Sequence, residues 1–196
     1  MTFADQNLTQ KAANGDVGAF TQLVKNHSGL VYRVALRILG TEGAQDASQE
    51  VWVRVWRNIE KFRGESAFST WLYKITVNTC LSTRRKEQTR ETREFGDELP
   101  YLSLPPGSDD NPETATLNEE RREELFRALR RVRTEHRAAL VLRHMEGLSY
   151  AEVAKILGVP VGTAKGWVSR GRAALLVALA EEKRGDESPN DQAGRS

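Results

Sequence analysis

Four polar and aromatic residues between positions 71 and 85 combine the side chains that hold single-stranded nucleic acid. Trp71 offers a flat stacking surface, and Asn78 offers an amide that can read the edge of a base. Lys74 and Arg85 add two cations for phosphates. The four recur at steps of three, four and seven, which places them along one edge of a helix. The alternative is a partly buried tryptophan on an ordinary basic surface helix.

A helix from about 69 to 86 is expected to carry this edge. Phe68 and Leu72 begin its inward face, and the loop before it mixes aromatic, basic and small residues over 61–71. The helix ends in the basic cluster Arg84-Arg85-Lys86, which is suited to following a phosphate backbone.

A second candidate for nucleic-acid binding lies between Leu148 and Arg172. Ser149 can cap a helix over 150–157, with Glu152 closing a capping box and Gly158 ending the helix. After a short turn a second helix is predicted from about 163 to 176. The pattern predicts a helix-turn-helix, and the alternative is a helical hairpin with a charged outer face.

The second helix of this pair has a packing face and a polar face. The packing face repeats at helical spacing: Ala164, Val168, Gly171 and Leu175. The other side carries small and polar residues between basic flanks, which suits a helix lying in the major groove: Gly162, Thr163, Lys165, Gly166, Ser169 and Arg170.

Three further helical segments are expected to build the domain that supports the Trp71 edge. Residues 8–24 predict a helix broken at 14–16, and Ser28 precedes a separate helix over 30–39. The third helix, 44–59, has a broad apolar arc. Its polar side is either a solvated face or a docking surface, and includes Asp46, Gln49 and Glu50.

Composition limits the remaining classes of function. The chain has 196 residues, 39% hydrophobic and 29% charged, with a net charge of +2. Its single cysteine, Cys80, excludes an internal disulfide. The three histidines form no recognisable ligand cluster, and no nucleophile–base set is visible, so we expect no catalysis, metal or cofactor. No apolar run is long enough for membrane insertion, which makes a cytoplasmic protein the default.

We therefore expect an all-α fold of two small helical domains joined by a flexible acidic linker. The first domain is assigned to 1–88 and the second, with the helix-turn-helix, to 119–182. The linker, 89–118, is rich in acidic residues and proline, and the tail, 183–196, is polar; both are expected to be disordered.

The chain resembles the extracytoplasmic-function (ECF) RNA polymerase sigma factors of the sigma-70 family. Two blocks in order carry the resemblance and cover nearly everything except the linker and tail. The first block comprises Gly15–Phe20, Gln45–Trp52, Phe62–Ile75 and Asn78; the second comprises Arg137–Ala154, Gly162–Lys165 and Arg170–Arg172.

The resemblance implies that the first domain binds the polymerase clamp and opens the minus-ten promoter element, and that the second binds the flap and reads the minus-thirty-five element. By motif, the polymerase-docking residues are Asp46, Gln49 and Glu50. The minus-ten residues are Arg63, Phe68, Trp71, Lys74, Asn78, Arg84 and Arg85. The minus-thirty-five residues are Thr163, Lys165, Trp167, Ser169, Arg170 and Arg172. Core RNA polymerase, promoter DNA and an anti-sigma factor are the implied partners.

One departure from the family pattern falls in the recognition helix. The family has Ser-Arg after its Gly-Thr-Val-Lys motif, whereas this chain has Gly166-Trp167, and Ala164 replaces the valine. Trp167 therefore either packs or touches the DNA backbone. A stand-alone dimeric helix-turn-helix regulator also explains 148–172, but leaves the 62–78 segment and the linker without a purpose.

Overall fold

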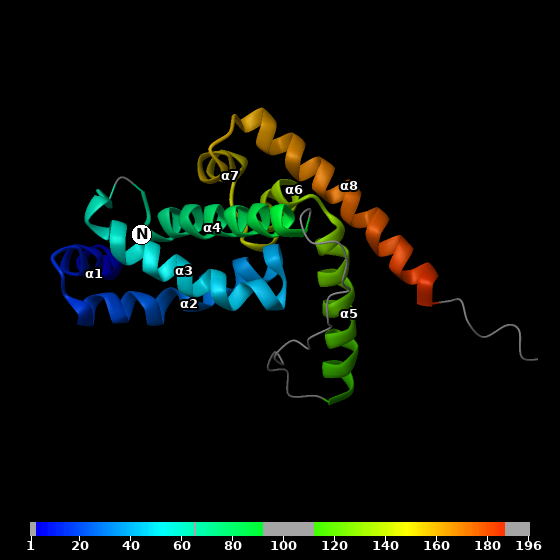
Figure 1. Cartoon of the computed structure of the whole chain (residues 1–196), viewed down its shortest axis with the longest axis horizontal. Coiled ribbons are helices and arrows are strands. Elements are labelled where there is room, and N and C mark those ends of the chain that lie inside the picture. The colour runs from blue at the N-terminus through cyan, green and yellow to red at the C-terminus, as the bar shows by residue number, and fades with distance from the viewer. Residues whose placement is uncertain (1–2, 65, 92–111, 187–196) are drawn as a thin grey trace, which may run out of the picture.

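Helices are the only regular secondary structure in the part of the chain that the structure describes. The computed structural model describes residues 3–64, 66–91 and 112–186, and contains no strand in those ranges (Figure 1). The elements in order are α1 (Phe3–Ala13), α2 (Val17–Leu39), α3 (Thr41–Asn58), the 3-10 helix η1 (Ile59–Lys61), α4 (Phe68–Glu91), α5 (Pro112–Arg131), α6 (Thr134–Leu140), the π-helical turn η2 (Val141–Met145), α7 (Tyr150–Leu157) and α8 (Val161–Asp186).

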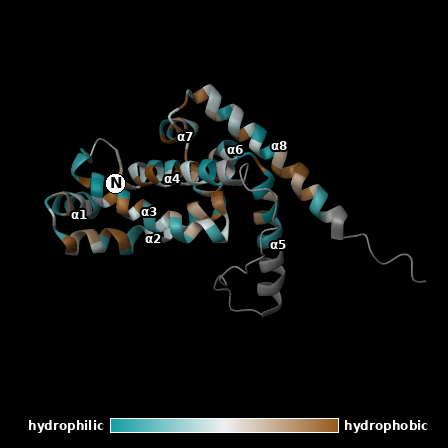
Figure 2. Ribbon diagram, in the orientation of Figure 1, coloured by the Kyte–Doolittle hydropathy of each residue, from teal (hydrophilic) through white to brown (hydrophobic). Residues whose placement is uncertain are grey.

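The first domain packs α1–α4 around an apolar core. Asp16 caps α2 by accepting a hydrogen bond from the Ala19 N–H at 2.9 Å. Gly40, at φ 87°, ends α2 and leads directly into α3. The fully buried side chains of this core come from α2, α3, η1 and α4: Leu23, Val31, Val51, Val55, Ile59 and Leu72. Both α2 and α3 carry hydrophobic (brown) and hydrophilic (teal) residues, as expected for helices that cover a core (Figure 2).

The separate helix predicted to follow Ser28 is not present, because α2 runs without interruption from Val17 to Leu39. Ser28 and Gly29 lie inside this helix, where contacts with α3 and α4 along its length outweigh their weak helix propensity. The break predicted near Asn14 is confirmed, since α1 ends at Ala13 and α2 begins at Val17.

The second domain contains the predicted helix-turn-helix. Ser149 and Glu152 form the complete capping box at the start of α7, and Gly158 ends that helix in the left-handed conformation at φ 68°. Ala164 and Val168 of α8 are buried as predicted. α8 extends ten residues beyond the predicted end at 176, and its far half packs along α5 through ion pairs of Arg127 with Glu182 and Arg131 with Glu181.

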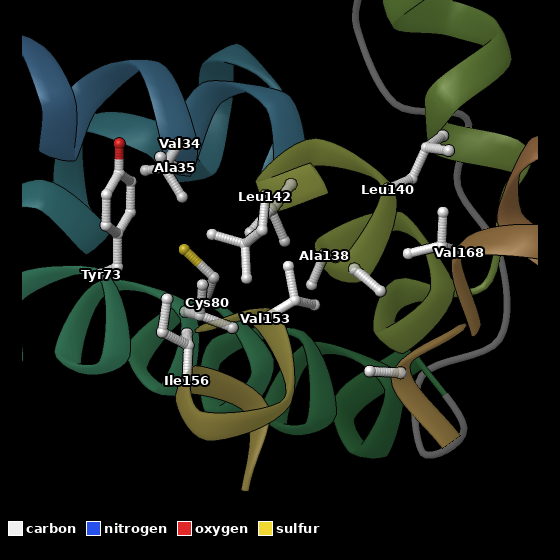
Figure 3. Packing of buried hydrophobic residues seen from close by; sticks show 14 of the residues in the cluster. Val34, Ala35, Tyr73, Cys80, Ala138, Leu140, Leu142, Val153, Ile156 and Val168 are labelled. Atoms are coloured by element: carbon white, nitrogen blue, oxygen red, sulfur yellow. The ribbon is translucent and has the colours of Figure 1, made fainter. Parts of the chain in front are cut away.

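The two domains pack against each other and share one hydrophobic cluster. Tyr73 and Cys80 of α4 lie beside Val153 and Ile156 of α7, with Leu142 of η2 above them (Figure 3). Side chains of α2 join the same cluster; α7 packs on α4, and α2 meets the second domain through α5, α6 and η2. The sequence predicted the two domains and left their arrangement open.

Helices also occupy the ends of the predicted linker. α4 continues to Glu91 and α5 begins at Pro112, so residues 89–91 and 112–118 are helical. Proline at the first helical position is favourable because its fixed φ suits the first turn and its missing N–H has no helical partner. The rest of the predicted linker, 92–111, and most of the predicted tail lie outside the described residues.

Candidate nucleic-acid interface

The predicted single-strand-binding edge lies on the solvent side of α4. Lys74, Asn78 and Arg85 are exposed, and Trp71 is partly buried. All four follow one edge of a single uninterrupted helix, as the spacing predicted. The edge therefore presents an indole, an amide and two cations to solvent in a fixed order.

Trp71 is held in place by a cluster of aromatic rings. Its ring centroid lies 5.3 Å from that of Phe62 and 5.8 Å from that of Phe68. Phe68 is only 2% exposed and contacts His27 on its other side. Phe68 thus belongs to the core beneath the edge, where it supports Trp71 and Phe62 rather than offering a free face. Arg63, which precedes Gly64 at φ 71°, is exposed in the loop above.

The basic end of α4 faces the second domain. Arg84 pairs with Glu87 at 3.1 Å, and both Arg84 and Arg85 line a cavity completed by the turn between α5 and α6. The buried Arg137 of α6 donates hydrogen bonds to the carbonyls of Ile38 and Val132. Burial, and then the charges of Arg84 and Arg130, lower the pKa of Arg137 to about 10. Residues predicted for one DNA element therefore touch the domain predicted for the other.

The predicted recognition helix, the first half of α8, presents an exposed basic face. Lys165, Ser169, Arg170 and Arg172 are exposed, and Thr163 is partly exposed. The Lys165 ammonium also lies 5.8 Å from the centre of the Tyr150 ring, which ties the start of α8 to α7. These side chains are compatible with insertion of α8 into a major groove.

Trp167 packs in this structure. It is partly buried against the core, and its ring centroid lies 6.2 Å from that of His136. Nearby, a Cβ built on Gly171 would lie 2.8 Å from the His136 backbone oxygen, so α8 approaches α6 more closely than a side chain at 171 permits. Burial, and then the charge of Arg170, lower the pKa of His136, which places a neutral ring beside the basic face.

The predicted docking face on α3 is exposed and acidic. Asp46, Gln49 and Glu50 all face solvent, as expected for a contact surface. Glu50 accepts a hydrogen bond from Arg54 at 2.6 Å, and this bond lowers the pKa of the Glu50 carboxyl. A cavity of about 490 Å³ lies between α3 and α4, and its lining includes Asp46, Glu50 and Lys86.

Sequence reasoning missed the polar contacts that join the domains. Glu146, whose side chain is 4% exposed, accepts hydrogen bonds from Arg37 of α2 and from the Tyr73 hydroxyl of α4, the latter at 2.7 Å. Arg33 approaches the same carboxylate at 3.5 Å. These partners are separated by up to 113 positions, and no local pattern around Glu146 marks it.

The described residues offer neither a metal site nor a membrane-spanning helix. In that part of the chain no group of three or more histidine, cysteine, aspartate or glutamate side chains is arranged to hold a metal ion. None of the helices described combines the length and apolar character needed to cross a bilayer.

Comparisons with known proteins cover both domains. Residues 23–90 match the family described as sigma-70 region 2, and residues 122–175 match the family described as sigma-70, region 4. The ECF RNA polymerase sigma-E factor of Escherichia coli strain K12 is 34% identical over 175 residues, which cover 87% of this chain and 92% of that protein. The sigma-E factor of Haemophilus influenzae is 34% identical over 172 residues, covering 86% of this chain and 91% of the relative.

Solved structures show the same fold. CnrH, in complex with the cytosolic domain of CnrY, aligns with a TM-score of 0.61 and 27% identity over 91% of this chain and 98% of its own. The sigma factor RpoE of Bartonella quintana, in complex with the anti-sigma factor NepR, aligns with a TM-score of 0.67 and 25% identity over 84% of this chain and 98% of its own. Together with the two matched regions and the similarity to sigma-E factors along most of the chain, the helical architecture establishes that this chain belongs to the ECF RNA polymerase sigma factors of the sigma-70 family.

Proposed function

We propose that the three surfaces described above divide the work of an ECF sigma factor, which binds core RNA polymerase, directs it to specific promoters and helps to open the DNA. The exposed carboxylates Asp46 and Glu50, with Gln49, dock on the polymerase clamp. Exposed acidic groups on a rigid helix provide the charge complementarity that favours rapid and specific docking. The domain division at 1–88, 89–118 and 119–182 is part of this proposal, and the extents of the two matched regions support it.

The α4 edge is proposed to hold unpaired bases of the minus-ten element. Trp71 supplies the stacking surface and Asn78 the base-edge contact, while Lys74, Arg84, Arg85 and Arg63 contact phosphates. Unpairing DNA costs about 1.4 kcal/mol per base-pair step, and stacking on an aromatic side chain returns roughly 1–3 kcal/mol per base. One or two captured bases therefore offset local opening but not a whole bubble, so polymerase must contribute the remainder.

The first half of α8 is proposed to read the minus-thirty-five element. Arg170, Lys165 and Arg172 are its cations, and Ser169 and Thr163 its neutral donors. Trp167 supports this helix by packing against His136. A good bidentate contact discriminates between bases by about 1–3 kcal/mol, so the exposed arginine at 170 is the residue whose loss should matter most.

The closed arrangement of the two domains is proposed to be a state that must open before promoter binding. The two elements are named for positions about 25 base pairs apart, which is about 85 Å along a duplex at roughly 3.4 Å per base pair. Packed helices have axes only about 8–10 Å apart. With α7 packed directly on α4, the two domains cannot reach both elements, and the shared cluster must separate.

We infer further that an anti-sigma factor binds this chain. The sigma factor of Bartonella quintana, which shares the fold over 84% of this chain, was solved with such a partner. The basic edge of α4 and the basic face of α8 offer complementary surfaces to an acidic partner. Because transcription takes place where polymerase and chromosome meet, we propose that the protein acts in the cytoplasm, by binding rather than by catalysis.

The observation that supports this function best is the exposed α4 edge braced by aromatic rings, joined in one chain to a capped helix-turn-helix. In vitro transcription tests it. Bacterial core polymerase reconstituted with the purified chain is expected to start at a defined set of positions in a genomic fragment library. Random or absent initiation, with normal initiation by a housekeeping sigma factor in the same assay, would refute the proposal.

A further inference from the structure

A cavity rich in arginine lies where the end of α4 meets the turn between α5 and α6. Its volume is about 310 Å³, and both domains contribute to its wall. Arg84 and Arg85 come from α4, and the other cationic wall residues come from α5, α6 and the turn between them: Arg130, Arg131, Arg133 and Arg137. Of the described residues that line the cavity, Glu135 is the one carboxylate.

The innermost cation of this cavity is fixed in position. Arg137 is 4% exposed, and its guanidinium donates hydrogen bonds to the backbone oxygens of Ile38, Arg130 and Val132. Because Ile38 belongs to α2, this arginine is held by both domains at once. Among the described residues its hydrogen-bond acceptors are all backbone carbonyls, so Arg137 adds a positive charge to the cavity wall that no carboxylate in this set neutralises.

Neighbouring carboxylates neutralise part of the remaining charge. Arg84 pairs with Glu87 at 3.1 Å, Arg133 with Glu135 at 3.1 Å and Arg131 with Glu181 at 2.8 Å. These pairs are partly exposed to water, where ion pairs are weak and exchange readily with other anions. An incoming anion of higher charge can therefore compete for the arginines.

We propose that this cavity binds a small polyphosphate, with two or more linked phosphate groups, and that the bound anion stabilises the closed arrangement of the domains. Guanidinium groups bind phosphate oxygens in paired hydrogen bonds, and several arginines around one cavity match several phosphates. The volume lies at the lower end of the range of about 300–1,000 Å³ that is usual for ligand sites, which suits a compact anion.

A small anion fits this site better than promoter DNA does. The wall is complete only while α4 lies against the α5–α6 turn, and that arrangement is incompatible with binding both promoter elements. A ligand that binds the closed state alone shifts the population toward it by mass action. The polyphosphate would thereby oppose promoter binding by the polymerase that carries this chain. Binding of the polyphosphate itself does not depend on the residue roles proposed above.

Isothermal titration of the full chain with sodium triphosphate, at about 0.15 M ionic strength, tests the proposal. We expect one binding site. An Arg85→Ala/Arg133→Ala double variant should bind triphosphate at least about tenfold more weakly. The loss of even one hydrogen bond to a charged group lowers the affinity by about a factor of ten or more. Both side chains are exposed, so the fold should survive, and circular dichroism checks that it does. Arg57→Ala removes an exposed arginine outside the cavity and should bind as the wild type does.

A second measurement reports the closed state. The rate at which a thiol reagent modifies Cys80, buried in the shared cluster, should fall as triphosphate is added to the wild type, and should not respond in the double variant. A nucleoside triphosphate in place of triphosphate identifies the source: tighter binding indicates a nucleotide, and equal binding indicates the phosphate chain alone. Equal affinity in the double variant and the wild type would overturn the proposal. Tighter binding of a DNA oligonucleotide at the same arginines, without slower Cys80 modification, would overturn it too.

Discussion

Replacing Glu146 by glutamine should loosen the packing between the two domains. The carboxylate is 4% exposed and receives hydrogen bonds from Arg37 and Tyr73. Glutamine keeps an oxygen for the tyrosine hydroxyl but removes the charge that compensates Arg37, whose side chain is 23% exposed. Breaking a buried charge pair costs about 3–5 kcal/mol, and a hydrogen bond to a charged group contributes about 1.5–3 kcal/mol.

Because Arg37 retains partial access to water, the smaller of these two costs applies. We expect Glu146→Gln to weaken the packing between the domains by about 2 kcal/mol. At about 1.4 kcal/mol per factor of ten, the ratio of open to closed molecules should rise about 30-fold. The shared cluster supplies its own reporter in Cys80, which is fully buried and is the chain's single cysteine. Burial raises the pKa of this thiol to about 12, so modification in the closed state is slow.

The assay is the rate of Cys80 modification by a disulfide reagent, which should rise about 30-fold in Glu146→Gln if opening exposes the thiol and reclosing is fast. Glu50→Gln is the matched control, since it removes a glutamate that also pairs with an arginine but lies outside the shared cluster. An unchanged rate in Glu146→Gln, or an equal increase in both variants, would refute the reasoning. Far-ultraviolet circular dichroism must show the same helix content in all three proteins.

Three further substitutions test individual residues. Arg170→Ala should weaken transcription from a promoter that depends on its minus-thirty-five element by about 1–3 kcal/mol, whereas Arg57→Ala should leave it unchanged; normal transcription with the first variant would count against the role of α8. Asn78→Ala should reduce open-complex formation, followed by permanganate reactivity, more than it reduces polymerase affinity, and an equal loss of both would exclude a base contact. Gly171→Ala should lower the free energy of unfolding, measured by urea titration, by about 1–3 kcal/mol, because its Cβ would meet a backbone oxygen of α6 at 2.8 Å. Gly162→Ala is the control: it has open space around it and should not lower the free energy of unfolding.

Local signals in the sequence were sufficient to predict the helix-turn-helix. The serine cap, the glutamate three residues later and the terminal glycine act within one helix, so Ser149, Glu152 and Gly158 specify α7 without help from the rest of the chain. The spacing of the α4 edge was predictable for the same reason.

Contacts between distant segments were not predictable in this way. The continuous α2 depends on packing against α3 and α4, which outweighs the weak helix propensity around Ser28. The position of Trp167 in α8 depends on His136 in α6, which precedes it by 31 positions in the sequence. Glu146 finds its partners across 73 and 109 positions, and only a complete fold brings them together.

α4 carries two sets of side chains with separate tasks. Tyr73, Val77 and Cys80 meet the second domain, whereas Lys74 and Asn78 point to solvent on another side of the same rod. A substitution in one set leaves the positions of the other set unchanged, because the two sets lie on different sides of a rigid helix. As related regulators diverge, the base specificity of α4 can therefore change while the packing between the two domains is retained.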